Sequence, residues 1–398
     1  MRTQSMLVNA TVLGLAQILV WGGSFFLMAV LADPVVRDTG WPRQWVYGSL
    51  SLGILISGLL SPRVGQLIAR HGGRRLLAGS GWVIAVGLVM LGAATSLPIF
   101  MLAWTIIGVG MAAGLYDSLF ATLAALHGEA ARRAISQVTL ISGFCTTLTW
   151  PVIGWLIEHV GWRHACWGYA ALLAVLVWPM YFMVLPPDGQ GTALTEHADA
   201  AAQAPPYGMA FTLLTMGFTL SSVIMTAISV QLIALMQAKG LSLTAAIGLG
   251  ALIGPSQVGA RAIDALASRL HPLWSALGST LLVAVGLLLL LAPAAASLGI
   301  VLYGAGSGIR SIVRGTLPLA LFGKRHYAVV LGRIARPVLI AQALTPLLGG
   351  YLMQQQGATF TLVALCLLAL LNMALVLALF PYRRGSTPVS AEGEQPSA

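Results

Sequence analysis

The sequence predicts an all-α membrane protein in which twelve transmembrane helices form two pseudo-symmetric six-helix bundles. Three observations lead to this prediction. First, 58% of the 398 residues are hydrophobic and 8% are charged, with a mean hydropathy of +0.88, which excludes a soluble globular domain. Second, apolar runs of roughly 20 residues, the length that crosses the ~30 Å hydrocarbon core, follow one another along nearly the whole chain. Third, the second half of the chain repeats the first.

The repeat keeps a constant offset of 196 residues. Ile-Gly-Val-Gly at 107–110 returns as Tyr-Gly-Ala-Gly at 303–306, and Pro-x-x-Gly-Trp-Leu at 151–156 returns as Leu-x-x-Gly-Tyr-Leu at 347–352. Two six-span halves related by a parallel repeat, with a cleft between them near the bilayer midplane, are typical of secondary transporters.

The apolar runs also fix the order of segments. The twelve predicted spans cover residues 8–31, 43–62, 76–95, 98–123, 135–159, 164–185, 208–235, 243–263, 273–293, 296–321, 328–353 and 359–381. They divide the chain into an N-terminal bundle at 1–185, a cytoplasmic linker at 186–207, and a C-terminal bundle with a short cytoplasmic tail at 208–398. The linker is rich in Pro, Ala and Gly and contains no Lys or Arg, which is typical of a flexible connection.

The net charge of +10 reflects topology. Thirteen basic residues fall on the side of the N-terminus, and the opposite loops hold four, Arg37, Arg43, Arg163 and Lys239. This positive-inside bias places both termini in the cytoplasm. We therefore expect no nucleic-acid partner, and we expect an integral protein of a bacterial inner membrane, surrounded by lipid.

A glycine- and arginine-rich loop follows the second predicted span. It reads Gly-Gln-Leu-Ile-Ala-Arg-His-Gly-Gly-Arg-Arg-Leu-Leu at 65–77, with a weaker echo, Gln-Val-Gly-Ala-Arg, at 257–261. The loop resembles the cytoplasmic signature of the major facilitator superfamily, and the spans, repeat and linker agree with that family over the whole chain. The resemblance implies rocking-bundle alternating access and assigns a gating role to Gly65, Arg70, Gly72, Arg74, Arg75 and Arg261.

The chain departs from the family pattern at three places. The acidic position of the signature is Ala69, the basic position that drug/proton antiporters carry in span four is Trp104, and their fifth-span motif remains as Pro151-x-x-Gly154. These departures argue against a conventional multidrug antiporter. The stretch 132–143 resembles monocarboxylate and oxalate transporters, whereas 114–123 and 314–323 resemble bacterial efflux permeases, including an arsenite-exporting branch.

Charged residues within the spans are the strongest functional signal. Each costs at least ~2.5–3.5 kcal/mol at the bilayer centre, so it is expected to face a cavity and a partner. Asp117 in span four is the candidate proton carrier. Arg310 and Arg314 in span ten, spaced i, i+4 and so able to share a helix face, are candidate ligands for an anionic solute. Arg333 and Arg336 in span eleven are assigned to the gate.

The sequence thus predicts a secondary active transporter that moves a small solute, a small organic anion, by proton-coupled alternating access. Further candidate solute-binding residues, chosen by their places in the spans, are Tyr116, Trp150 and Tyr303. The alternatives are an efflux permease for a drug or a trivalent metalloid such as arsenite, with Cys145 as a soft ligand, and a non-transporting membrane sensor. We expect no enzymatic activity, no cofactor and no metal site, and we expect a monomer whose partner is its small-molecule substrate.

Overall fold

The computed structural model describes residues 2–128, 131–188, 208–266 and 271–384, and these residues form helices and short connections without a strand. In the first half the helices are α1 (Arg2–Gly22), α2 (Met28–Thr39), α3 (Arg43–His71), α4 (Arg74–Gly92), α5 (Leu97–Gly114), α6 (Tyr116–His127), α7 (Ala131–Ser142) and α8 (Cys145–Val184). In the second half they are α10 (Met209–Ala238), α11 (Leu243–Leu266), α12 (Pro272–Leu290), η2 (Pro293–Ala295), α13 (Ala296–Ala378) and η3 (Phe380–Arg384).

These helices make twelve passes. Glycines with positive φ turn the chain inside the long helices, at Gly161 in α8 and at Gly323 and Gly357 in α13, so α8 contains the second part of the fifth pass and the sixth pass, and α13 contains three passes. Within the described residues, nine helical stretches are long and apolar enough to cross a membrane, one of which is the double pass at 131–184. The pass formed by α1 and α2, and that formed by α11, complete the twelve.

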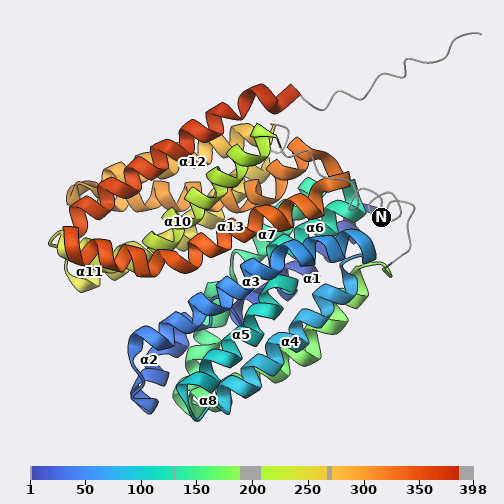
Figure 1. The fold of residues 1–398 in the computed structure, drawn as a ribbon, viewed down its shortest axis with the longest axis horizontal. Coiled ribbons are helices and arrows are strands. Elements are labelled where there is room, and N and C mark those ends of the chain that lie inside the picture. The colour runs from blue at the N-terminus through green and yellow to red at the C-terminus, as the bar shows by residue number, and fades with distance from the viewer. Residues whose placement is uncertain (1, 129–130, 189–207, 267–270, 385–398) are drawn as a thin grey trace, which may run out of the picture.

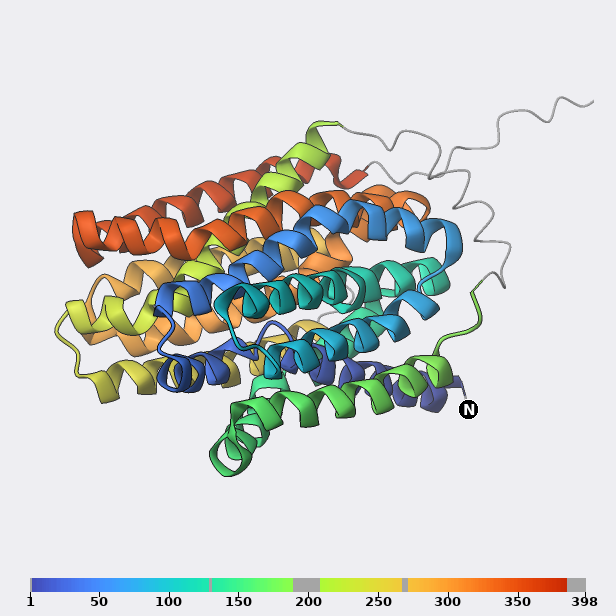
Figure 2. The same ribbon diagram turned by 60° about the horizontal axis from the view of Figure 1, so that its bottom comes forward.

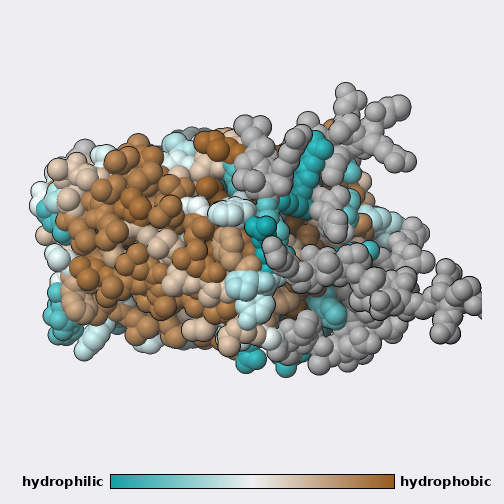
Figure 3. Space-filling model, turned by 90° about the horizontal axis from the view of Figure 1, so that it is seen from above, coloured by the Kyte–Doolittle hydropathy of each residue, from teal (hydrophilic) through white to brown (hydrophobic). Residues whose placement is uncertain are grey.

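The passes gather into two bundles. In Figure 1, α1–α5 and α8 lie mostly in the lower half and α10–α13 mostly in the upper half, with α6 and α7 between them; the bundles meet at the end that carries the N-terminus and diverge at the other. In the turned view of Figure 2 the last pass of α13, in red, lies along the upper edge and α8, in green, along the lower edge. Figure 3 shows a broad hydrophobic surface between hydrophilic ends, as expected of a protein embedded in lipid. The predicted domain boundaries stay predictions, because residues 189–207 lie outside the described part of the chain.

Close backbone contacts join the bundles at the end that carries the N-terminus, which we call the closed end. A Cβ atom placed on Gly65 of α3 would fall on the carbonyl oxygen of Ala328, and one placed on Gly332 of α13 would fall on that of Ser61. One buried hydrophobic cluster accordingly runs from the N-terminal bundle into residues 319–343 of α13. Small residues allow this approach of backbones in lipid.

Three passes of the N-terminal bundle are interrupted midway. The first breaks between Gly22 and Met28, the fourth at Leu115, whose ψ is −177°, and the fifth between Ser142 and Cys145. Side chains donate hydrogen bonds to backbone carbonyl groups near these breaks. The Gln17 amide donates to Gly114 O at 2.7 Å, and the Cys145 thiol donates to Ile18 O at 3.4 Å. Residues 8–31, 98–123 and 135–159 were each predicted as one continuous span, so these three interruptions correct those expectations.

Candidate functional site

An ion pair between Asp117 and Arg314 connects the two bundles. Arg314 Nε donates to Asp117 Oδ1 at 2.8 Å, and Arg314 Nη2 donates to Oδ2 at 2.6 Å. The contact is bidentate, the stronger of the geometries open to an arginine and a carboxylate. Both side chains are mostly buried, with 18% of Asp117 and 20% of Arg314 exposed. The pair lies within spans four and ten, where the sequence analysis placed its two residues separately.

The break in the fourth pass sets the position of Asp117. Because α5 ends at Gly114 and α6 begins at Tyr116, Asp117 lies in the first turn of a new helix, where the helix dipole favours a negative charge. On the opposite side, Gly315 follows Arg314, and its missing side chain leaves room for Phe120 of α6. Because residue 315 is a glycine, the two helices approach closely enough for the ion pair to form.

Arg261 is a second buried cation at the bundle interface. It extends from α11 and is 8% exposed. Its guanidinium donates to the carbonyl oxygen of Thr139 in the opposite bundle at 3.1 Å and to that of Gly308 at 3.3 Å. Among the described residues its partners are neutral, so Arg261 adds a positive charge to the layer that holds the ion pair. The position echoed from the signature loop thus lies inside the protein, next to the predicted site.

Tyr116 faces the same layer from the N-terminal bundle. Its hydroxyl lies 2.5 Å from that of Ser142 on α7. Its ring is stacked with Phe120 at a centroid distance of 5.1 Å and lies 5.0 Å from Trp21. Trp21 also contacts Phe25 and Phe26, and Trp150, which is 38% exposed, donates from its indole nitrogen to Phe26 O at 3.1 Å. A continuous set of rings therefore extends from Tyr116 toward Trp150.

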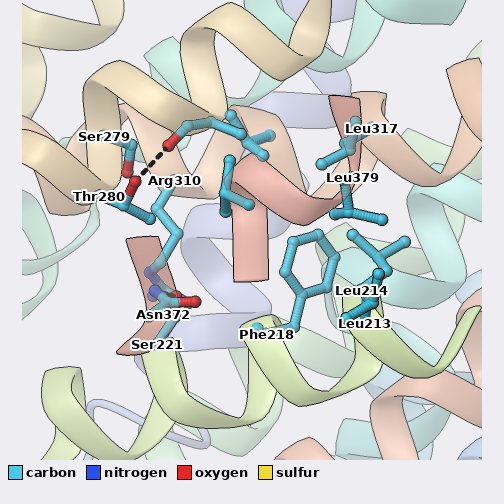
Figure 4. A pocket seen from close by; sticks show the side chains of 14 residues that line it. Leu213, Leu214, Phe218, Ser221, Ser279, Thr280, Arg310, Leu317, Asn372 and Leu379 are labelled. Carbon is cyan, nitrogen blue, oxygen red and sulfur yellow. Dashed lines mark hydrogen bonds between the residues drawn. The ribbon is translucent and has the colours of Figure 1, made fainter. Parts of the chain in front are cut away.

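Arg310 and Arg314 diverge although they are one helical turn apart. Arg314 reaches the opposite bundle, whereas Arg310 points into its own, among α10, α12 and the last pass of α13, where it contacts Met225 and lies beside Asn372 (Figure 4). Tyr303, 2% exposed, lines the same space. The structure therefore brings together Asp117, Arg314 and Tyr116, and separately Arg310 and Tyr303, with Trp150 at the edge of the aromatic set.

The signature loop is fixed to the end of the sixth pass. The backbone N–H groups of Arg74 and Arg75 donate to the two carboxylate oxygens of Asp188 at 2.9 and 3.0 Å. The Arg74 guanidinium donates to Phe182 O at 2.8 Å and lies 4.0 Å above the Phe182 ring. Gly72 has φ of +89° and packs against Asp188. Asp188 thus caps α4, a contact that the sequence analysis missed because the acid lies 119 positions after Ala69.

The remaining residues assigned to the gate lie around the closed end. Gly65 packs against the backbone of Ala328, as described above, and Arg70 is exposed at the end of α3. Arg336 is exposed, with its carbonyl close to Gly58, and Arg333 is half-buried. The predicted gate residues of the signature loop and of span eleven are therefore found on facing helices at one end of the molecule.

Cys145 does not lie in a ligand cluster. It is buried, and its thiol is 3.9 Å from the Thr149 hydroxyl. In the part of the chain that the structure describes, no group of three or more His, Cys, Asp or Glu side chains is arranged to hold a metal ion. Among the described residues, Cys145 therefore has no second thiol, imidazole or carboxylate beside it that would help to bind a trivalent metalloid.

Comparisons with known proteins identify the family. The family model described as Major Facilitator Superfamily matches residues 13–332. A curated mouse protein, solute carrier family 2, facilitated glucose transporter member 10, is 29% identical over 158 residues, which are 38% of this chain and 27% of that protein, so the match spans about a quarter of the relative's length.

Solved structures share the fold. The human organic anion transporter MFSD10 (TETRAN) aligns with a TM-score of 0.72 at 18% identity, covering 94% of this chain and 99% of its own. The proton:xylose symporter XylE aligns at 0.69 and 16% identity, covering 95% of each chain, and FucP in the outward conformation aligns at 0.75 and 11% identity, covering 96% and 100%. The predicted twelve-pass fold is confirmed, and the chain belongs to the major facilitator superfamily.

Proposed function

We propose that this transporter moves a small organic anion together with a proton by alternating access, and that the Asp117–Arg314 pair couples the two. The observation that carries the proposal is the bidentate ion pair between bundles in a region where Arg261 has neutral partners among the described residues. One acid beside two arginines leaves an excess of positive charge, which favours an anionic ligand.

The ion pair offers a physical route to coupling. While Asp117 is ionised, its two carboxylate oxygens accept hydrogen bonds from Nε and Nη2 of Arg314, which holds the two bundles together. When Asp117 takes up a proton, its charge is lost and Arg314 needs another anion, because an unpaired buried charge is costly. A carboxylate of the solute supplies that anion. The solute and the proton then cross together with no net charge, while the bundles rock around them.

The other assigned residues complete this proposal. Tyr116 and Trp150 contribute an aromatic wall beside the ion pair, suited to the apolar part of a solute. The loop at Gly65–Arg75, with Arg261, Arg333 and Arg336, forms the gate at the closed end. The structural likeness to a transporter described as an organic anion transporter supports the substrate class. The protein works as a monomer in a bacterial inner membrane, with both termini in the cytoplasm, as the charge distribution indicates.

A reconstituted-vesicle assay tests the proposal. Uptake and efflux are measured for a panel of monocarboxylates, dicarboxylates, xylose, glucose and arsenite, with and without a proton gradient. We expect a carboxylate to accumulate only when the gradient is present. Arg314→Gln should weaken its binding by about tenfold or more, since a hydrogen bond to a charged group contributes about 1.5–3 kcal/mol. Arg133→Gln, which removes an exposed arginine, is the matched control.

The variant Asp117→Asn separates coupling from binding. It imitates the protonated acid, so it should keep solute binding and exchange but lose accumulation against a gradient. Undiminished gradient-driven accumulation in Asp117→Asn removes Asp117 from the mechanism. Transport of xylose, glucose or arsenite in place of every organic acid overturns the assigned substrate class.

A further inference from the structure

The Arg310 guanidinium lies inside the C-terminal bundle without an anion beside it. Its Nη2 contacts the thioether sulfur of Met225, a weak acceptor, and its Nε has no hydrogen-bond partner. The charged groups that act on it include Arg314, one turn away on the same helix, and Arg261 of α11, and both repel it. Among the described residues no carboxylate forms an ion pair with Arg310. The Arg310 side chain is half-buried and its Nε is fully buried, and a charge held in this way is expected to have a counter-ion.

Two adjoining cavities next to Arg310, which we call the Arg310 recess, provide space for one. Their volumes are about 20 and 10 Å³, and both are lined by Ser221, Ser279, Thr280, Arg310 and Asn372. A water molecule needs roughly 10–15 Å³ measured in this way. The Arg310 recess therefore accommodates one or two water-sized particles, and a carboxylic acid with several carbon atoms does not fit.

The donors of the Arg310 recess are suited to an anion, whereas Asn372 Oδ1, which is buried without a partner, is an acceptor. Ser279 and Thr280 already donate to backbone carbonyls. Asn372 Nδ2 donates one proton to Ser221 Oγ at 2.8 Å, which leaves its second proton and the Ser221 hydroxyl proton available. Together with Arg310 Nε, these groups offer three donors and one full positive charge to the same small space (Figure 4).

We propose that the Arg310 recess binds one small inorganic anion of the size of chloride as a resident counter-ion. Its lining comes from α10, α12 and α13, all within the C-terminal bundle, so a rocking motion between bundles leaves the site intact. The ion is therefore separate from a solute held at Arg314. By cancelling the charge of Arg310, it also reduces the repulsion that Arg310 exerts on Arg314 one turn away.

Thermal unfolding of the purified protein tests this assignment without any transport measurement. The protein and its Arg314→Met variant, which lacks the arginine proposed to bind a carboxylate solute, are titrated with sodium chloride or bromide at constant ionic strength, with sodium gluconate as the replacement salt; the variant decides the comparison because gluconate is itself a carboxylate. We expect a saturable rise in Tm of about 2 °C or more with either halide and none with gluconate. Arg310→Met, which keeps the side-chain bulk but removes the charge, should abolish the rise. Arg314→Met, which removes the neighbouring arginine of the same helix, should keep it.

A crystallographic measurement supports the titration if Arg310→Met does not fold. Crystals grown in bromide should show an anomalous peak between Arg310 and Asn372. Equal Tm in chloride and gluconate, meaning that the recess holds water alone, overturns the proposal. So does a halide-dependent rise that persists in Arg310→Met, a bromide peak found at Arg314 instead, or an Arg310→Met variant that loses binding of an organic acid but keeps its response to halide.

Discussion

The ion pair between Asp117 and Arg314 should contribute measurably to the stability of the closed end. At a charge separation of about 4 Å and an effective dielectric constant near 20, the attraction is about 4 kcal/mol. About one fifth of each side chain remains exposed, and desolvation opposes the attraction, so we expect a coupling energy of about 2 kcal/mol. Asp117→Asn alone should cost about 3 kcal/mol, because it leaves Arg314 buried without its partner.

A double-mutant cycle measures this coupling directly. The free energy of unfolding in mixed detergent micelles is compared for the unaltered protein, Asp117→Asn, Arg314→Gln and the double variant. We expect the double variant to be more stable than the sum of the single losses predicts, by about 2 kcal/mol. Additive losses, within about 0.5 kcal/mol, would refute the reasoning that the pair holds the bundles together.

Three further predictions follow from the packing, the capping contact and the charge distribution. Gly332→Ala should loosen the closed end, because its Cβ would meet a backbone carbonyl oxygen of α3. Gly350→Ala on the same helix has open space around its Cβ and should be neutral. The labelling rate of a cysteine introduced at the closed end should be higher in Gly332→Ala than in Gly350→Ala. Asp188→Ala should destabilise α4 by about 1 kcal/mol, because it removes the two hydrogen bonds that cap the helix. Hydrogen exchange of the backbone amides at 72–77 should then be faster. Glu158→Ala, which removes an exposed acid, should leave that exchange unchanged. A reporter active only in the periplasm, fused after residue 384, should be inactive, and its activity would contradict the cytoplasmic placement of the C-terminus.

The sequence was sufficient to predict the fold because its signal is periodic and repeated. Apolar runs of membrane-spanning length follow one another along nearly the whole chain, and motifs of the first half return in the second half at an offset of 196 residues. The glycines of span four allow close packing: a Cβ on Gly108 would meet the backbone of Gly53, and one on Gly110 would meet Ile84. Asp117 and Arg314 were both among the candidates for the site because a charged residue within an apolar span is costly and therefore expected to face a cavity and a partner.

The sequence was insufficient where the outcome depends on side-chain direction or distant contacts. Spacing of i, i+4 predicts a shared helix face for Arg310 and Arg314, but their long side chains extend in opposite directions from it, toward different bundles. Asp188 follows a predicted span as an ordinary linker acid, and its role in capping α4 depends on tertiary packing that no local pattern encodes. Glycine is also common in transmembrane helices, so Gly114 gave no warning that its helix ends there.

The interrupted passes of the N-terminal bundle make the two halves of the molecule mechanically unequal. Three of its passes are jointed near their middles, close to Asp117, whereas the described residues of α10, α11 and α12 form uninterrupted rods. A break in a helix concentrates bending into a few backbone dihedral angles, whereas an unbroken helix moves as one unit. We therefore expect the C-terminal bundle to move more nearly as a rigid body. We expect the N-terminal bundle to bend at its three helix breaks, which changes its surface around a bound molecule while its core stays packed.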